Sequence, residues 1–285
     1  MAISLFNRRK TDNPEMTFVD HLEELRWHIM RSLIAVIVGA IVVFINIDWI
    51  FDQIIAGPLQ KDFYTYKALC DLSTWLGVGD SLCLPPPSTE GGLQTTTFGS
   101  QFMTSITIAF VGGFIFAFPY IFWEFWRFVK PALSPKELKS TRGAIFFVSI
   151  FFFLGISFGY FLLAPFTFSF LANYTIGTSH ILIARPTLAD YMENLIDIMI
   201  GSALAFQLPV ISYVLTRIGL ITPSFLKTYR KYSYVAILVI AAIITPSPDW
   251  MSQMIVFLPL AFLYEFSVII SVRVFKRQQE KDKNW

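Results

Sequence analysis

The sequence predicts an all-α, polytopic membrane protein that crosses the bilayer six times, with both chain ends on the same side. Two features of its composition predict this class: 55% of the 285 residues are hydrophobic, and only 15% are charged. A soluble domain carries about a quarter charged residues. The charges also leave long uncharged runs between them, and a transmembrane helix needs about 20 mostly apolar residues. We therefore expect a single membrane domain.

Prolines and polar stretches separate six apolar segments of the chain. Pro165 and the polar stretch from Asn173 to His180 are expected to end the third segment. Pro246 and Pro248 predict a tight reversal between the fifth and the sixth, because proline cannot continue a helix. The predicted spans are residues 29–48, 102–126, 142–164, 194–214, 230–246 and 251–272.

The last two spans rest on the shortest uncharged runs of the set. By the length rule alone, a single re-entrant hairpin is the alternative in this region. If both segments are helices, they are expected to be short, and a short helix is accommodated by local thinning of the bilayer.

The basic residues predict the orientation of the chain. All but three of the 22 Lys and Arg residues fall in the two terminal segments and in the loops after the second and fourth spans. The exceptions are Lys61, Lys67 and Arg185. Cytoplasmic loops carry the excess of basic residues, so both termini are predicted to be cytoplasmic. The net charge of +2 reflects this topology and does not indicate a nucleic-acid partner.

Two segments that flank the first span are expected to have structure of their own. Residues 17–30 predict an amphipathic helix at the cytoplasmic interface, because Thr17 and Asp20 match a capping box and apolar residues recur at helical spacing. The loop 49–101 contains helix-like stretches and the extended run 85–87, and we expect it to cap the bundle on the outer side.

Cys70 and Cys83 both fall in this outer loop. A disulfide between them is favoured over two free thiols, because both cysteines lie on the side that faces an oxidising compartment.

One stretch of the sequence matches an enzyme motif, but the residues that such a motif needs for catalysis are not placed around it. Gly155-Ile-Ser157-Phe-Gly159 matches the nucleophile pattern G-x-S-x-G, but it lies inside a predicted span with no histidine placed to activate the serine. Small residues at this spacing are expected to pack helices together. No phosphate-binding loop and no Cys/His spacing typical of a metal site is present. We predict no enzyme, no metal and no cofactor.

Two glutamates outside the spans have alternative roles. Glu24 shares one helix face with His21 and His28, and it is either a solvated charge or part of a binding site. Glu137 lies three residues after Ser134 and fits a helix cap.

Two polar residues lie inside predicted spans, where a polar group is costly and usually faces the protein interior or a wet cavity. Gln207 precedes Pro209 in the fourth span and could make a helix-packing hydrogen bond. Glu265 lies in the sixth span, or at its interface if that helix is short.

A set of short motifs resembles the TatC family, the polytopic receptor of the twin-arginine, or Sec-independent, protein translocase. The matches occur in family order from residue 17 to about residue 273. They are His21-Leu-Glu-Glu24-Leu-Arg26, Ala56-Gly57-Pro58-Leu59, Trp126-Arg127-Phe128-Val129-Lys130-Pro131-Ala132-Leu133 with Glu137, Gly155 to Pro165, Phe206-Gln207-Leu-Pro209, and Ile244-Thr245-Pro246 with Asp249, Ser252 and Gln253.

The resemblance implies a function and a set of partners. TatC proteins bind the twin-arginine signal peptide of folded cargo at the cytoplasmic face of the bacterial inner membrane. They organise single-span partners of the TatA and TatB types into a passage driven by the proton-motive force. A concave helix bundle, a capping outer loop and self-association in the receptor complex are implied as well.

The resemblance also assigns roles to individual residues. Glu24 and Glu137 match the acidic positions that recognise the arginine pair, with Arg26, Phe128 and Pro131 beside them. Other matches are Gln207 on the concave face, Thr245 and Gln253 at the docking site of partner helices, and Pro58 and Asp249 as structural residues of the outer loops. Glu265 is a candidate intramembrane polar residue by its position in the sixth span alone.

The chemistry agrees with this assignment, because guanidinium binds carboxylate in a bidentate geometry that lysine copies poorly. One departure matters: many family members have glutamate where this chain has Gln207. Glutamine cannot titrate, so proton uptake at this position is doubtful here. A secondary transporter or small channel is the alternative function, although the chain has no internal repeat and few charges in its spans.

Overall fold

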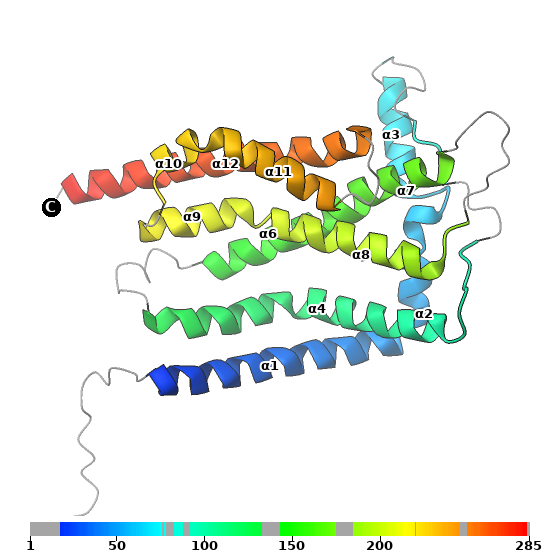
Figure 1. Ribbon diagram of the computed structural model, residues 1–285, viewed down its shortest axis with the longest axis horizontal. Coiled ribbons are helices and arrows are strands. Elements are labelled where there is room, and N and C mark those ends of the chain that lie inside the picture. The colour runs from blue at the N-terminus through cyan, green and yellow to red at the C-terminus, as the bar shows by residue number, and fades with distance from the viewer. Residues whose placement is uncertain are drawn as a thin grey trace, which may run out of the picture.

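Helices parallel to one another form the body of the molecule. The computed structural model describes residues 18–75, 77, 83–87, 92–132, 143–174, 185–219, 221–244 and 250–283. Among these residues, the regular structure is helical apart from one isolated β-bridge between Gln94 and Thr187. The long helices lie side by side, and the short helices α2 and α3 lie across one end of the bundle (Figure 1).

The membrane-crossing elements are long helices, some of them interrupted by a turn of different pitch. By length and composition, five helical segments of the described part of the chain can cross a membrane, and α11 adds a shorter apolar helix. The elements are α1 (Phe18–Ile45), α4 (Ser100–Val129), α6 (Ala144–Phe158) with η5 (Gly159–Leu163) and α7 (Ala164–Asn173), α8 (Leu188–Ala205) with α9 (Leu208–Ile218), α11 (Arg230–Ile244) and α12 (Trp250–Lys283).

Shorter elements connect these helices. At the end away from both termini lie α2 (Ile47–Ile50), η1 (Phe51–Ile55), η2 (Gly57–Leu59) and α3 (Tyr64–Trp75). At the other end lie η4 (Lys130–Ala132) and α10 (Pro223–Thr228).

The first helix differs from the prediction of a separate amphipathic helix before the first span. Helix α1 runs without a break from Phe18 to Ile45. No glycine or proline occurs between Phe18 and Gly39, so nothing in the sequence interrupts the hydrogen-bond ladder. The amphipathic segment is therefore the first part of the membrane helix itself.

Pro165 does not end the third membrane helix, contrary to the sequence-based expectation. It occupies the first turn of α7, where a missing N–H is tolerated, and α7 continues to Asn173. The five-residue π-turn η5 immediately precedes it. A π-turn absorbs such an irregularity without ending the helix.

The sixth helix is long, so the expectation of two short final helices was wrong in part. Helix α11 has 15 residues, which is about 22 Å of helix, but α12 has 34 residues and extends to Lys283. Uncharged runs underestimate this length, because Lys, Arg, Glu and Gln favour helix and continue α12 beyond its apolar part.

Glycines bring two pairs of helices into backbone contact. A Cβ atom added at Gly113 of α4 would lie 2.4 Å from the backbone nitrogen of Ala40 in α1. A Cβ added at Gly155 of α6 would lie 2.6 Å from the Cα of Ala203 in α8. Close approach at small residues is a common way to pack membrane helices. The interpretation of Gly155 as a packing position is therefore confirmed.

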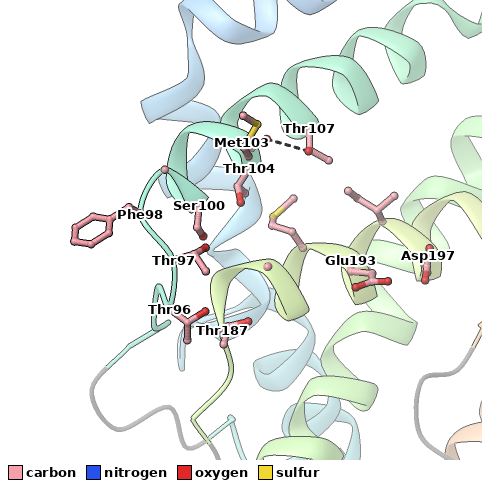
Figure 2. Close-up of a pocket in the computed structure, with 14 residues that line it drawn as sticks. Thr96, Thr97, Phe98, Ser100, Met103, Thr104, Thr107, Thr187, Glu193 and Asp197 are labelled. Atoms are coloured by element: carbon pink, nitrogen blue, oxygen red, sulfur yellow. Dashed lines mark hydrogen bonds between the residues drawn. The ribbon is translucent and has the colours of Figure 1, made fainter.

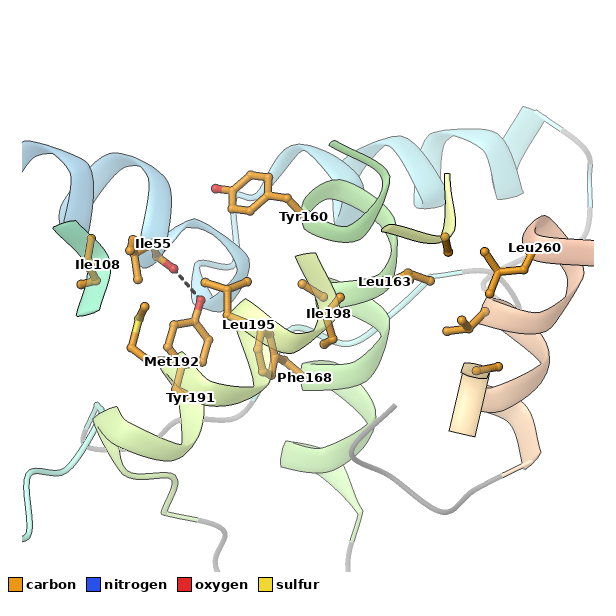
Figure 3. Close-up of a cluster of buried hydrophobic side chains, with 14 of the residues drawn as sticks. Ile55, Ile108, Tyr160, Leu163, Phe168, Tyr191, Met192, Leu195, Ile198 and Leu260 are labelled. Carbon is orange, nitrogen blue, oxygen red and sulfur yellow. Dashed lines mark hydrogen bonds between the residues drawn. The ribbon is translucent and has the colours of Figure 1, made fainter. Parts of the chain in front are cut away.

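Tyrosines attach the crosswise elements to the bundle. The Tyr191 hydroxyl of α8 donates to the Ile55 carbonyl at 2.5 Å (Figure 3). The Tyr160 hydroxyl donates to the Ile54 carbonyl at 2.5 Å. The Tyr66 hydroxyl of α3 donates to the carbonyl of the buried Pro58 at 2.8 Å. Burial raises the pKa of the Tyr66 phenol above its ordinary value. These bonds satisfy carbonyls that the irregular turns leave free.

We predict that Gly113→Ala lowers the free energy of unfolding by about 1–3 kcal/mol, because the new methyl group collides with the α1 backbone rather than with a movable side chain. Thermal unfolding of the purified protein in detergent measures the change. The control is Gly112→Ala, whose Cβ would meet the Val43 side chain at 3.1 Å and should have a smaller effect. Equal effects of the two substitutions would contradict the prediction.

Candidate functional site

The candidate site lies where the start of α1 meets the end of α4. These two helices are antiparallel neighbours along their length (Figure 1). Helical spacing of three and four residues puts His21, Glu24 and His28 on one side of α1. His21 stacks on Phe128 of α4 with ring centroids 4.3 Å apart, and His28 meets the same ring edge-on at 6.2 Å.

Glu124 is the most buried charged residue of this region, with 1% of its surface exposed. Its Oε2 atom pairs with Nδ1 of His28, which is also buried. Its Oε1 atom accepts a hydrogen bond from the Tyr120 hydroxyl at 2.9 Å and lies 3.6 Å from the Arg127 guanidinium. Both carboxylate oxygens are therefore engaged, and they join α1 to α4.

Glu24 has the opposite environment. Its Oε2 atom is buried and has no hydrogen-bond partner in the described part of the chain. A buried polar atom without a partner costs about 1–3 kcal/mol. Such an atom needs an explanation, and an absent ligand is one. Glu24 and Glu124 thus differ in what they can do: Glu124 is saturated and Glu24 has a free acceptor.

The other residues assigned to signal-peptide binding differ in how exposed they are. Phe128 is half-buried beneath His21, and Arg26 and Pro131 are exposed at the same end of the bundle. Glu137 lies outside the described residues, so the structure does not show its distance from Glu24.

The intramembrane polar residues make contacts within the chain. The Gln207 amide donates to the Val148 carbonyl at 3.2 Å, which ties the fourth membrane helix to the third. Glu265 accepts from Arg230 at 2.8 Å and from the Tyr234 hydroxyl at 2.5 Å. Both carboxylate oxygens of Glu265 are engaged, as in Glu124.

The remaining predicted residues with described positions are Gln253 in the first turn of α12 and the two cysteines. The Gln253 amide donates to the Leu238 carbonyl at 3.3 Å and so links α12 to α11. Thr245 and Asp249 lie outside the described residues. Cys70 and Cys83 are joined in a disulfide, 13 residues apart in sequence.

Sequence reasoning missed the role of Glu124. Arg127, three residues further along the chain, is the only partner for Glu124 that the local sequence suggests. The useful observation is that Tyr120, Glu124 and Phe128 recur at helical spacing. They lie on the face of α4 that meets α1.

Comparisons with known proteins agree with this architecture. Residues 20–259 match the family described as "Sec-independent protein translocase protein (TatC)". The TatC protein of Blattabacterium sp. subsp. Periplaneta americana is 39% identical over 94% of this chain and 100% of the relative. That of Desulforapulum autotrophicum is 32% identical over 93% of this chain and 87% of the relative. The chain belongs to the TatC family.

A solved TatC structure supports the assignment at the level of the fold. A crystal structure described as the twin arginine translocase receptor TatC superposes with a TM-score of 0.66 at 29% identity, covering 89% of this chain and 99% of the other. The chain is thus a multi-pass membrane protein with six transmembrane helices, and a TatC-type component of the Sec-independent protein translocase.

We predict that Glu124→Ala destabilises this TatC protein by about 1–3 kcal/mol, because His28 is left buried without its acceptor. Thermal unfolding in detergent provides the measurement, with Glu23→Ala as the control, since Glu23 is an exposed carboxylate on α1, the helix that carries His28. His28→Ala combined with Glu124→Ala should cost less than the sum of the single changes. Strict additivity would show that the two side chains are not coupled.

Proposed function

We propose that this TatC protein acts as a receptor, and not as an enzyme, that binds twin-arginine signal peptides of folded proteins. Glu24 and Glu137 are the proposed carboxylates for the two arginines. The observation that carries the proposal is the buried Oε2 atom of Glu24, which has no hydrogen-bond partner in the described residues. A guanidinium group would supply the missing donors.

The chemistry favours arginine over lysine as the ligand of such a site. A guanidinium offers donors in a planar fork that matches a carboxylate, whereas an ammonium is a point charge. His21, three residues before Glu24 on α1, stacks on Phe128, and an aromatic ring there offers a flat face on which a guanidinium plane can lie. Two carboxylates would then select a pair of arginines.

The pairing of Glu124 with His28 has a supporting role in this proposal. Because both oxygens of Glu124 already have partners, the residue is unsuited to receive a further arginine. It holds α1 against α4 and so fixes the position of Glu24. Arg26, Phe128 and Pro131 would line the surface around the bound peptide.

We further propose that single-span partners of the TatA and TatB types dock at α11 and α12. Helix α11 exposes a row of large apolar side chains: Val235, Leu238, Val239, Ile240 and Ile243. Such a surface suits a neighbouring helix within the bilayer. Thr245 and Gln253 are the proposed polar contacts, and Gln253 would exchange its bond to the Leu238 carbonyl for one to a partner.

The proposed location is the inner membrane of a bacterium, with both termini in the cytoplasm and transport driven by the proton-motive force. The strong excess of basic residues on the side of the termini supports this orientation. Gln207 acts by hydrogen bonding rather than by proton uptake, since an amide does not titrate and this one is bonded to Val148.

We predict that Glu24→Gln weakens binding of an Arg-Arg signal peptide about tenfold, because one charge-assisted hydrogen bond contributes roughly that factor. Retention of labelled peptide by the purified protein is the measurement, and export in cells is the second readout. Glu23→Gln removes a neighbouring exposed carboxylate and should leave binding unchanged.

The same experiment compares an Arg-Arg peptide with a Lys-Lys peptide. Wild-type protein should retain the Arg-Arg peptide more strongly, and Glu24→Gln should reduce that preference. Unchanged binding and export after substitution of both Glu24 and Glu137 would refute the proposed site.

A further inference from the structure

A groove of about 500 Å³ lies between the first turns of α4 and α8, at the end of the bundle away from both termini. Helix α4 lines it with Ser100, Thr104 and Thr107, and α8 lines it with Met192, Glu193 and Asp197 (Figure 2). None of these residues belongs to the site described above.

Backbone pairing fixes the mouth of this groove. The Gln94 N–H donates to the Pro186 carbonyl at 3.1 Å, and the Leu188 N–H donates to the Gln94 carbonyl at 2.8 Å. These two bonds hold the segments that lead into α4 and α8 side by side. The groove is therefore bounded by fixed backbone.

Thr104 indicates that the groove is built for a polar ligand. Only 8% of the residue is exposed, and Figure 2 shows its hydroxyl directed into the groove. Within the described residues this hydroxyl has no hydrogen-bond partner, whereas the neighbouring Thr107 hydroxyl donates to the Met103 carbonyl at 3.0 Å. A nearly buried hydroxyl that faces an open groove is available to an incoming group.

Two carboxylates line the α8 side of the groove. Glu193 and Asp197 are four residues apart on α8, and both side chains are exposed along this helix (Figure 2). Neither forms an ion pair with any residue that the structure describes. Asp197 lies about 13 Å along α8 from its start, within a segment apolar enough to cross the membrane. A carboxylate on a helix that crosses the membrane favours a cation beside it.

The chain itself has few cations to offer at this end. Lys67 is already paired with Asp62 at 2.9 Å. Arg185 lines a different pocket, together with Asp190 and Tyr191. Lys61, the third basic residue at this end, forms no ion pair within the described residues. None of the three thus neutralises Glu193 or Asp197 in the described chain, and a cation from outside it can do so.

We propose that this groove binds the headgroup of a phospholipid that carries a primary ammonium, of the phosphatidylethanolamine type. Glu193 and Asp197 would accept hydrogen bonds from the ammonium. The Ser100 and Thr104 hydroxyls, with the first-turn N–H groups of α4, would donate to the phosphate oxygens. Gly99 caps α4 without a side-chain hydrogen bond, and the Ser100 N–H already donates to the Thr97 carbonyl at 3.2 Å. The N–H groups of Gln101 and Phe102 are therefore the ones available to a phosphate.

The rim of the groove favours a lipid over a soluble polypeptide as the occupant. Phe98 and Met103, which line it, are both more than half exposed. Large apolar side chains at the end of a membrane helix lie at the level where headgroups meet acyl chains. A lipid places its charged group in the groove and its chains against this rim.

The test uses the purified full-length protein and an equimolar mixture of phosphatidylethanolamine, phosphatidylcholine and phosphatidylglycerol, with bound lipid counted by native mass spectrometry. We expect about tenfold preference for phosphatidylethanolamine, because it alone of the three has ammonium N–H donors for the carboxylates. Phosphatidylcholine lacks those donors, and phosphatidylglycerol lacks the cation.

Variants locate the preference within the molecule. Glu193→Gln with Asp197→Asn should abolish the preference, and Thr104→Val should weaken retention of all three lipids. Asp71→Asn, an exposed carboxylate of α3, is the matched control and should keep the wild-type ranking. The ranking in wild-type protein needs no variant, so it tests the proposal even if a substitution impairs folding.

Three results would overturn the proposal. One is equal retention of the three lipids by wild-type protein. Another is an unchanged ranking in the folded double variant. The third is displacement of phosphatidylethanolamine by a lysine-rich peptide that binds wild-type protein but not the double variant, since this would assign the groove to a polypeptide.

Discussion

The close crossing of α1 and α4 is the contact on which the candidate receptor site depends. Gly113 allows the backbones to approach so closely that even a methyl group would collide with α1. This approach brings His28 within reach of Glu124 and stacks His21 on Phe128. Without it, the face of α1 that carries Glu24 would have no fixed partner surface. Packing of small residues in the membrane thus positions polar chemistry at its edge.

The carboxylates of the membrane helices fall into two groups with different physical roles. Glu124 and Glu265 have both oxygens engaged, and each joins one helix to another. Glu24 and Asp197 lack partners within the described chain, and each faces a surface open to a ligand. A polar group in or beside hydrocarbon is costly unless it has a partner. The carboxylates without a partner in the described chain therefore indicate where a ligand can bind.

Helix ends were harder to infer than helices. Apolar runs located the spans, but Pro165 was expected to stop a helix that continues to Asn173, and α12 extends well past its apolar part. Proline in a first turn after a π-turn costs little, and charged residues continue a helix readily once it leaves the bilayer. Both outcomes depend on the local backbone, which hydropathy does not report.

The sequence by itself determined the class and the number of membrane helices, because hydrocarbon admits only helices whose length and composition can be counted along the chain. It also determined the family, through short motifs that occur in family order. It also pointed to Glu24. Only the tertiary structure decided which polar groups have partners: it paired Glu124 with His28 across 96 positions and left Glu24 and Asp197 open. Whether a polar group has a partner depends on the distance between helices that are remote in sequence. Those distances are set by packing rather than by any local pattern.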